Sequence, residues 1–426
     1  GRQLRLHVAV AEAGAQDAEP DPLFFFAGGP GQAASETWVM IRGSLSRILK
    51  NRDIVLVDQR GTGQSNPLRC ESADMAELDA EIDLELIREE TRKCLENLDG
   101  DPRFYTTTIA AGDIDRVRRA MGYERINIMG VSYGSRAAQV YERNFPQSVR
   151  TMTLDSVVPM DLALGQEHAP MLDRAAERVM NDCEADSTCR ETFPDRGEEL
   201  SALFARLREE PQRITIIDPR TGEPRELLLT AETLAVAIRF LSYASETQAL
   251  LPLLVHEALS TGRLERLASQ ALLVMDDLTQ MIARGMELSV MCAEDYPAID
   301  FGIDYADTMI GNIMLESIRT QCEIWPRGEL PADFREPRAS AVPTLLLSGE
   351  RDPVTPPEYA ARTAEAYPNH LNLVARGQSH SVLRNPCLQD IATAFVEAGS
   401  VEGLDTSCTE SIGPSPFFTT LLGPEP

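Results

Sequence analysis

Residues 130–134 read Gly-Val-Ser-Tyr-Gly and lie between an apolar run at 125–129 and a helical pattern at 135–145. A strand that enters Gly-x-Ser-x-Gly and leaves as a helix is typical of a sharp turn that lifts a serine hydroxyl clear of a sheet. The two glycines give the neighbouring backbone the room that side chains would occupy. The helix also directs the positive end of its dipole at Ser132. The motif alone fits a glycine-rich turn with a surface serine equally well.

The sequence around this motif predicts a mostly parallel sheet. Residues 23–27, 53–57 and 344–347 are continuous apolar runs, as expected of strands that are buried on both faces. A further strand is predicted at 149–157, and residues 3–10 alternate polar and apolar like a half-buried strand. Helical patterns separate most of these strands, so we expect an α/β fold.

Between residues 159 and 337 the alternation of strands and helices stops. Long helical patterns dominate this stretch, with one hairpin predicted around residues 213–229. We therefore expect an inserted, mainly helical cap at 159–337, between an N-terminal part of the α/β core at 1–158 and a C-terminal part at 338–426.

The composition argues against several classes of partner. The chain has 426 residues, 43% of them hydrophobic, and a formal net charge of -27. This charge disfavours nucleic acid and anionic membrane surfaces, whereas it attracts a cation such as the free amino terminus of a peptide. No apolar run approaches the roughly 18 residues that a membrane span requires. No metal-binding motif is present, and no cofactor is expected.

The eight cysteines fall into neighbouring couples along the chain. These couples are Cys70 and Cys94, Cys183 and Cys189, Cys292 and Cys322, and Cys387 and Cys408. Sequential local pairing is the simplest of the many possible connectivities. The alternative is a set of reduced, mostly buried thiols in a cytosolic enzyme. We favour four disulfides, and hence export to the periplasm or the extracellular space.

A serine nucleophile needs an imidazole to take its proton and a carboxylate to hold the imidazole in the correct tautomer. Asp352 follows the apolar run at 344–347, and His380 follows a predicted strand at 371–374. Ser132 also follows a strand, and open sheets carry their sites at the carboxyl ends of strands. The order serine, acid, histidine along the chain is that of the α/β-hydrolase sheet.

Other residues compete for two of these roles. Glu350 is an alternative acid, but Asp352 lies at a more typical distance from its strand and is followed by a proline that fixes the turn. An Asp-Pro pair is also a common turn former, and a histidine in a loop is often only solvated. The remaining histidines lack a comparable context; these are His7, His168, His256 and His370.

Two glycine-containing loops precede the serine. The Gly-Gly-Pro-Gly at 28–31 lets the backbone approach a scissile carbonyl and offer one N–H to a developing oxyanion, while the residue after the serine offers the second. It also fits a plain turn at the end of a strand. The loop at 58–65 lacks the lysine of a phosphate-binding loop, so we interpret it as structural support, with Arg60 as an organiser of salt bridges.

The combined motifs resemble the proline iminopeptidase family of α/β-hydrolases. They resemble most closely its exported branch, the tripeptidyl-aminopeptidase-like proteins with a characteristic C-terminal segment. The motifs that carry this resemblance lie at 28–31, 58–65, 130–134, 349–355 and 377–380. The likeness covers nearly the whole chain and implies an α/β-hydrolase fold and a serine exopeptidase that removes residues from peptide amino termini.

By position, the resemblance implies a role for each site residue. Ser132 would be the nucleophile, His380 the general base and acid, and Asp352 the carboxylate that orients the imidazole. The backbone N–H groups of Gly29 and Tyr133 would form the oxyanion hole. Proline iminopeptidases carry a histidine before Gly-Gly-Pro-Gly, whereas this chain has alanine at that position, a departure that indicates the exported branch.

Within the expected cap, residues 289–297 place Glu294 and Asp295 beside Cys292. The segment resembles the acidic stretch by which this family holds the amino group of its substrate. An ammonium held at a fixed distance from the serine would restrict cleavage to chain ends. The alternative is a charged helix end at the surface, which is common in so acidic a protein.

The sequence therefore predicts a serine aminopeptidase, of the proline iminopeptidase or the di- or tripeptidyl type, that acts on peptides with a free amino terminus through an acyl-enzyme. A carboxylesterase or another small-molecule hydrolase on the same triad is the alternative, since it differs only in what the cap admits. A non-catalytic binding protein on this fold usually lacks a member of the triad, and this chain has all three.

Overall fold

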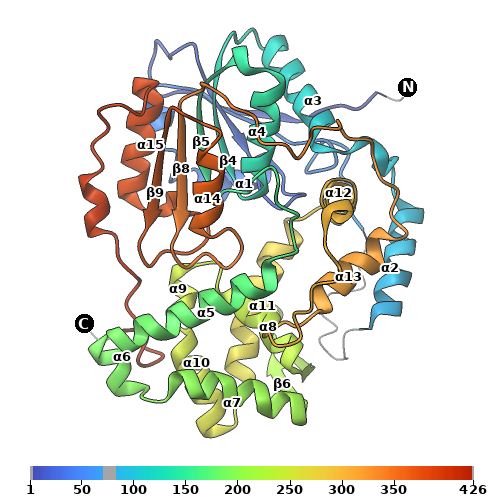
Figure 1. The fold of residues 1–426 in the computed structure, drawn as a ribbon, viewed down its shortest axis with the longest axis vertical. Coiled ribbons are helices and arrows are strands. Elements are labelled where there is room, and N and C mark those ends of the chain that lie inside the picture. The colour runs from blue at the N-terminus through green and yellow to red at the C-terminus, as the bar shows by residue number, and fades with distance from the viewer. Residues whose placement is uncertain (1–2, 71–82, 425–426) are drawn as a thin grey trace.

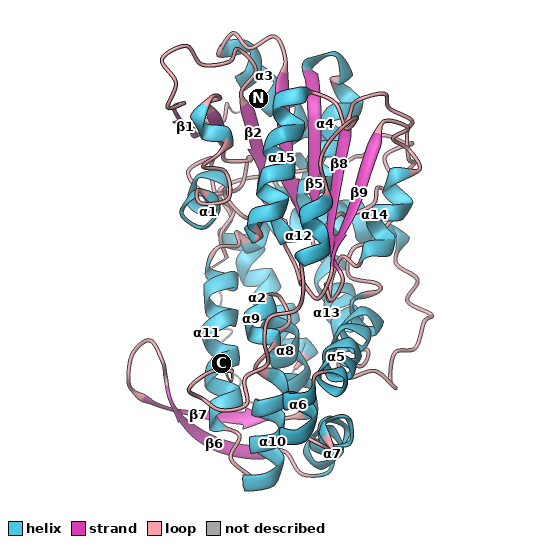
Figure 2. Ribbon diagram, turned by 90° about the vertical axis from the view of Figure 1, so that its left-hand side faces the viewer, coloured by secondary structure: helices cyan, strands magenta, loops and turns pink. Residues whose placement is uncertain are grey.

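The computed structural model describes residues 3–70 and 83–424, apart from the side chains of residues 276–278. Two parts are visible in Figures 1 and 2: a sheet between helices at one end, and a group of helices with a small hairpin at the other. The C-terminal segment runs from the sheet to the helical part, where Phe417 joins a hydrophobic core.

Seven strands form the main sheet in the part of the chain that the structure describes. Their order is β1 (Val8–Ala11), β3 (Ile54–Val57), β2 (Leu23–Phe26), β4 (Ile126–Val131), β5 (Val149–Asp155), β8 (Thr344–Gly349) and β9 (His370–Ala375). Only β1 runs antiparallel to its neighbour among these pairs. The prediction of a mostly parallel sheet is confirmed, although the first strand begins at Val8 and not at residue 3.

Helices cover both faces of this sheet. They are α1 (Ala34–Ile41), α3 (Thr107–Ala120), α4 (Tyr133–Asn144), α14 (Pro357–Ala364) and α15 (Pro386–Ala398). Phe24 and Phe26 of β2 pack with residues of α3, α4 and α14, whereas Leu23 and Phe25 pack with residues of α1 and α15. Successive side chains of a strand point to opposite faces, so a strand with two covered faces is apolar throughout.

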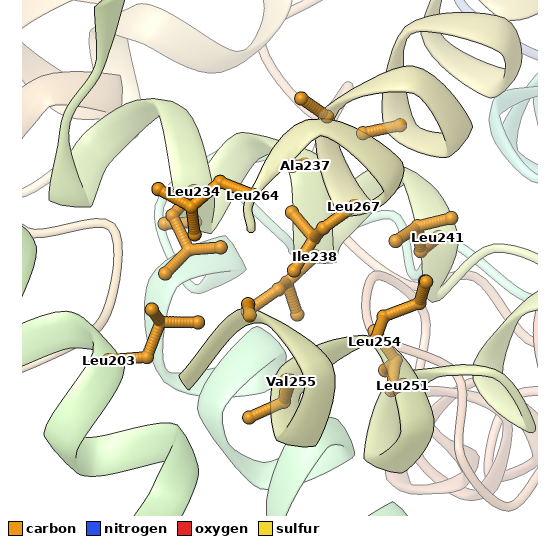
Figure 3. Packing of buried hydrophobic residues seen from close by; sticks show 14 of the residues in the cluster. Leu203, Leu234, Ala237, Ile238, Leu241, Leu251, Leu254, Val255, Leu264 and Leu267 are labelled. Carbon is orange, nitrogen blue, oxygen red and sulfur yellow. The ribbon is translucent and has the colours of Figure 1, made fainter. Parts of the chain in front are cut away.

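The helical part has a hydrophobic core of its own, shown in Figure 3. Its elements are α5 (His168–Ala185), α6 (Ser187–Thr192), α7 (Arg196–Glu209), β6 (Gln212–Ile217), β7 (Pro224–Leu229), α8 (Ala231–Leu241), α9 (Ser245–Gln248), α10 (Leu251–Thr261) and α11 (Glu265–Gln280). Leu234 and Ile238 of α8 lie in this core together with Leu254 of α10 and Leu267 of α11. The hydroxyl of Thr230 caps the first turn of α8 by accepting a hydrogen bond from the Thr233 amide.

Part of the chain from 284 to 322 packs against the sheet part instead, whereas Ile310 belongs to the core of the helical part. Met286 and Val290 of α12 (Arg284–Val290) belong to the same hydrophobic cluster as Phe24 and Phe26. The next helix, α13 (Ile313–Cys322), contacts α2 (Leu84–Asn97). The stretch 159–337 thus packs in two places, and its treatment as one cap domain stays a prediction.

All four expected cysteine couples form disulfides. Cys292–Cys322 joins the chain after α12 to the end of α13, and Cys387–Cys408 joins α15 to the C-terminal segment. Within the described residues, no helix has the length and apolar character needed to cross a bilayer.

Candidate active site

Ser132 lies in the turn between β4 and α4, half-buried, with a φ of 56° and a ψ of -127°. A positive φ is uncommon for a residue with a side chain and indicates a constrained turn. Both flanking glycines are sterically required. A Cβ on Gly130 would lie 2.3 Å from the Gly134 oxygen, and a Cβ on Gly134 would lie 2.1 Å from the Phe26 oxygen. The local geometry is therefore that of the predicted serine turn.

His380 and Asp352 are joined by a hydrogen bond of 2.8 Å between Nδ1 of the imidazole and Oδ2 of the carboxylate. Asp352 is buried and also accepts hydrogen bonds from the amides of Val354 and Thr355 and from the Thr355 hydroxyl. Burial alone would raise the pKa of Asp352, but the charge and hydrogen bond of His380 and these further donors lower it to about 2.

The same contact determines the state of the imidazole. Burial lowers the pKa of His380, but the attraction of Asp352 outweighs it, and the pKa lies above its usual value. An ionised Asp352 holds the proton on Nδ1 and leaves Nε2 as the ring nitrogen that can accept one. Glu350 does not contact the imidazole; its carboxylate accepts the Gly377 amide and pairs with Arg178.

Asp155, at the end of β5, links the serine turn to the histidine loop. Its backbone oxygen accepts the Ser132 amide at 2.9 Å, and its carboxylate accepts the amides of Val382 and Leu383. The two loops therefore meet on one residue, which brings Ser132 and His380 to the same edge of the sheet. Sequence analysis missed Asp155, although an acidic residue at the end of the strand predicted at 149–157 was the available signal.

The Gly-Gly-Pro-Gly loop lies directly against the serine. A Cβ on Gly28 would be 3.2 Å from Cβ of Ser132, and Gly29 has a φ of 103° that favours glycine. Neither the Gly29 amide nor the Tyr133 amide donates a hydrogen bond to another residue that the structure describes. Both predicted oxyanion donors are thus available to a substrate oxygen. They also follow two strands that pair with each other, β2 and β4.

The loop at 58–65 supports this arrangement. Asp58 accepts hydrogen bonds from the amides of Ser35 and Gln64, which ties the start of α1 to the loop. Arg60 forms a salt bridge of 2.6 Å with Asp113 of α3. The loop also reaches the residue after the serine, because Gln59 donates a hydrogen bond to the Tyr133 hydroxyl.

Glu294 and Asp295 are 1% and 0% exposed, so the surface helix end considered as an alternative is excluded. Glu294 accepts hydrogen bonds from the amide and the hydroxyl of Thr107, at 2.6 and 2.8 Å. The Thr107 hydroxyl is also 2.6 Å from the hydroxyl of Tyr133. Burial raises the pKa of Glu294 to about 7. Glu294 is therefore connected through Thr107 to the residue that follows the serine.

Asp295 has a different partner. Its Oδ1 lies 2.7 Å from Nη1 of Arg136 on α4 in an ion pair that is fully buried, and it accepts the Leu164 amide at 2.8 Å. Its second oxygen, Oδ2, has no hydrogen-bond partner among the described residues. The structure places both carboxylates close to α4, inside the protein, and their contact with a substrate amino group stays a prediction.

The helical part contributes an aromatic ring to the site. Tyr243, just after α8, contacts the His380 ring edge to face, with the ring centroids 5.1 Å apart. Arg239, in the last turn of α8, donates a hydrogen bond of 3.2 Å to the Tyr243 hydroxyl. A shallow pocket lies between residues 244–246 and the histidine loop. Sequence analysis did not identify these residues, because only tertiary packing brings α8 to the sheet.

Comparisons with known proteins agree with this architecture. Residues 21–207 match the family described as alpha/beta hydrolase fold, and residues 307–408 match the family described as TAP-like protein. The tripeptidyl aminopeptidase of Streptomyces coelicolor is 24% identical in an alignment of 460 positions that covers 98% of this chain and 81% of that protein. The serine protease Hip1 of Mycobacterium tuberculosis is 25% identical in an alignment of 425 positions that covers 89% of this chain and 79% of that protein.

Proposed function

Since the chain is an α/β-hydrolase with a TAP-like C-terminal segment, we propose that this serine hydrolase is an aminopeptidase that releases N-terminal residues from peptides. The observation that carries the serine-hydrolase chemistry is the Asp352–His380 pair, which shares the edge of the sheet with the constrained Ser132. The names of two distant relatives, a tripeptidyl aminopeptidase and a serine protease, support the choice of peptides as substrates.

In the proposed mechanism, Nε2 of His380 takes the proton of the Ser132 hydroxyl as the oxygen attacks the scissile carbonyl. The amides of Gly29 and Tyr133 stabilise the oxyanion that forms. His380 then gives its proton to the leaving amine, and water cleaves the acyl-enzyme by the same route. Asp352 stays ionised throughout and stabilises the imidazolium.

The substrate's amino group is assigned to Glu294 and Asp295 in this proposal. Asp295 keeps Oδ2 without a partner among the described residues, whereas an ammonium would compete with Thr107 for Glu294. The net charge of -27 adds a general attraction for cationic chain ends. The four disulfides support a location in the periplasm or outside the cell.

The first test is hydrolysis of aminoacyl, dipeptidyl and tripeptidyl chromogenic amides, each with a free and an acetylated amino terminus, beside a short acyl ester. Ser132→Ala serves as the blank. We expect the free amides to turn over and the acetylated ones to resist, with the preferred length defining the number of residues released. If only the ester is hydrolysed, the protein is a carboxylesterase and the peptidase proposal is wrong.

Substitution of the acidic pair tests the amino-group contact. Glu294→Gln and Asp295→Asn remove a negative charge with little change of shape, so we expect KM for free-amine substrates to rise about 10-fold or more. KM for an N-blocked ester should change far less, because that substrate has no ammonium to lose. Equal effects on both substrates would show that the pair supports the fold and does not bind substrate.

A further inference from the structure

Arg239 is a cation without a carboxylate partner in the part of the chain that the structure describes. Arg239 is half-buried, and its hydrogen-bond partners are Nδ1 of His168 at 3.1 Å, the Tyr243 hydroxyl at 3.2 Å and the sulfur of Met314 at 3.5 Å. Its guanidinium carbon also lies 6.0 Å from the centroid of the Tyr243 ring. All three acceptors are neutral. The C-terminal end of α8 supplies only a partial negative charge, so the guanidinium charge is not fully compensated.

The chain has 67 acidic and 40 basic residues, so carboxylates outnumber the cations that they could pair with. The arginines that are buried in the described structure each pair with a carboxylate; they are Arg52, Arg136, Arg196 and Arg351. A desolvated cation is costly unless a negative charge faces it. An arginine left with neutral partners is therefore a candidate for an anion that the protein itself does not supply.

The neighbours of Arg239 present further hydrogen-bond donors. Because Nδ1 of His168 accepts from Arg239, the neutral ring carries its proton on Nε2, and this buried atom has no partner among the described residues. The Tyr243 hydroxyl likewise accepts from Arg239 and keeps its own hydrogen to donate. The cluster of Arg239, His168 and Tyr243 thus offers donors and no free acceptor, which is the chemistry of an anion site.

The donor cluster lies beside His380, the residue that donates a proton to the leaving fragment in the proposed mechanism. Tyr243 contacts the ring of His380, which in the proposed mechanism protonates the leaving amine. The electrostatic influence of Arg239 also reaches His380, whose pKa it lowers against the larger effect of Asp352. A group bound by the cluster would therefore belong to the fragment that departs and not to the acyl group held by Ser132.

We propose that Arg239, His168 and Tyr243 form a subsite for a carboxylate on the leaving fragment of the substrate. This inference rests on the proposed peptidase function, in which that fragment is the remainder of the peptide. Two sources supply the carboxylate: an acidic side chain on the first residue after the cleaved bond, or the C-terminal carboxylate when that residue is the last one.

The test compares matched peptides that share the best acyl part found in the amide assay. The peptides of one pair end in Glu-amide or Gln-amide and differ only in the side-chain carboxylate. The peptides of the other pair end in Gln free acid or Gln-amide and differ only in the C-terminal carboxylate. We expect the carboxylate member of at least one pair to have a kcat/KM higher by about 10-fold to 100-fold, the range for a hydrogen bond to a charged group. A wild-type protein with no preference in either pair overturns the proposal.

Variants then assign the preference to the cluster. Arg239→Gln should abolish it, Arg239→Lys should keep part of it, and Tyr243→Phe should reduce it by about 3-fold through loss of one donor. Arg213→Gln is the matched control, because Arg213 is an exposed arginine on the hairpin strand β6 and takes no part in the site described above. If Arg239→Gln lowers kcat/KM equally for both peptides of a pair, the result would show that Arg239 only positions Tyr243 against His380.

A third pair separates this proposal from the peptidase proposal. Acetyl esters of 4-hydroxybenzoate and 4-hydroxybenzamide differ only by the carboxylate on the leaving group and need no peptidase activity. Preference for the benzoate that Arg239→Gln removes would uphold the subsite even in a protein that cleaves no peptide. If neither the esters nor the peptides show a preference for the carboxylate-bearing leaving group, the subsite is rejected. The proposed peptidase function would not be affected by that result.

Discussion

At the scale of single residues, we expect the Asp352–His380 pair to determine how activity depends on pH. The attraction of Asp352 raises the pKa of His380, and only the neutral imidazole can accept the proton of Ser132. We expect kcat/KM to fall on the acid side around a pKa above the usual value of about 6.5. Asp352→Asn should lower kcat by about four orders of magnitude without unfolding the protein, as circular dichroism would check.

Glu294 gives a second prediction at this scale. Its pKa of about 7 in the folded protein exceeds that of an unfolded glutamate, so the folded state holds a proton that the unfolded state releases. The contribution of Glu294 to the free energy of unfolding is fully present below pH 4. It decreases by on the order of 3 kcal/mol as the pH rises through 7. Glu294→Gln should remove that slope, as urea denaturation at several pH values would show; an unchanged slope contradicts the assignment.

The residues of the proposed triad could be identified from the sequence because each follows an apolar strand, and parallel strands bring their carboxyl ends to one edge. Arg239 and Tyr243 could not be predicted, since nothing in the sequence of α8 indicates which strand it will face. The burial of Glu294 and Asp295 was equally hidden. Their partners, Thr107 and Arg136, are more than a hundred residues away along the chain.

At the scale of elements, the crossing of β2 and α4 depends on the absence of one side chain. A Cβ at Gly134 would lie 2.1 Å from the Phe26 oxygen, which is backbone and cannot rotate away. Gly134→Ala should destabilise the fold by several kcal/mol, within the range of about 1–5 kcal/mol for overpacking and strain, and abolish hydrolysis. Thermal denaturation and the amide assay would measure both effects.

Gly112 provides the matched control for this prediction. It lies inside α3, where an added Cβ would meet no atom within 4 Å. Alanine suits a helix interior better than glycine by about 0.5–1 kcal/mol, so Gly112→Ala should stabilise the protein slightly and keep its activity. If both variants lost stability and activity to a similar degree, the close contact of α4 with β2 would not be the cause.

The strands of the sheet were predicted well because burial on both faces leaves an unmistakable apolar run. The boundaries of β1 were not, since it lies at the edge of the sheet and its burial pattern is only partial. The long helices of the helical part were predicted by their period, but the return of α12 to the sheet was not. Met286 and Val290 are apolar in either setting, so periodicity alone does not tell which core receives them.

At the scale of the whole molecule, the disulfides close loops of different length. Cys292 and Cys322 are 30 positions apart, and Cys183 and Cys189 are 6 apart. In the loop-entropy description the longer closure contributes about 4 kcal/mol and the shorter about 2 kcal/mol. Replacing each couple by alanine should therefore lower the urea midpoint more for the first couple; the reverse order would show that packing outweighs loop entropy.

The order of the sheet also has a consequence for the making of the protein. β5 ends at Asp155 and pairs with β8, which begins only at Thr344. At roughly 5–20 residues per second, a ribosome needs about 10 to 40 seconds to deliver the missing neighbour. During that interval the growing chain holds a half-built sheet with an unpaired edge, and the helices made meanwhile bury their own apolar surface before the last strands arrive.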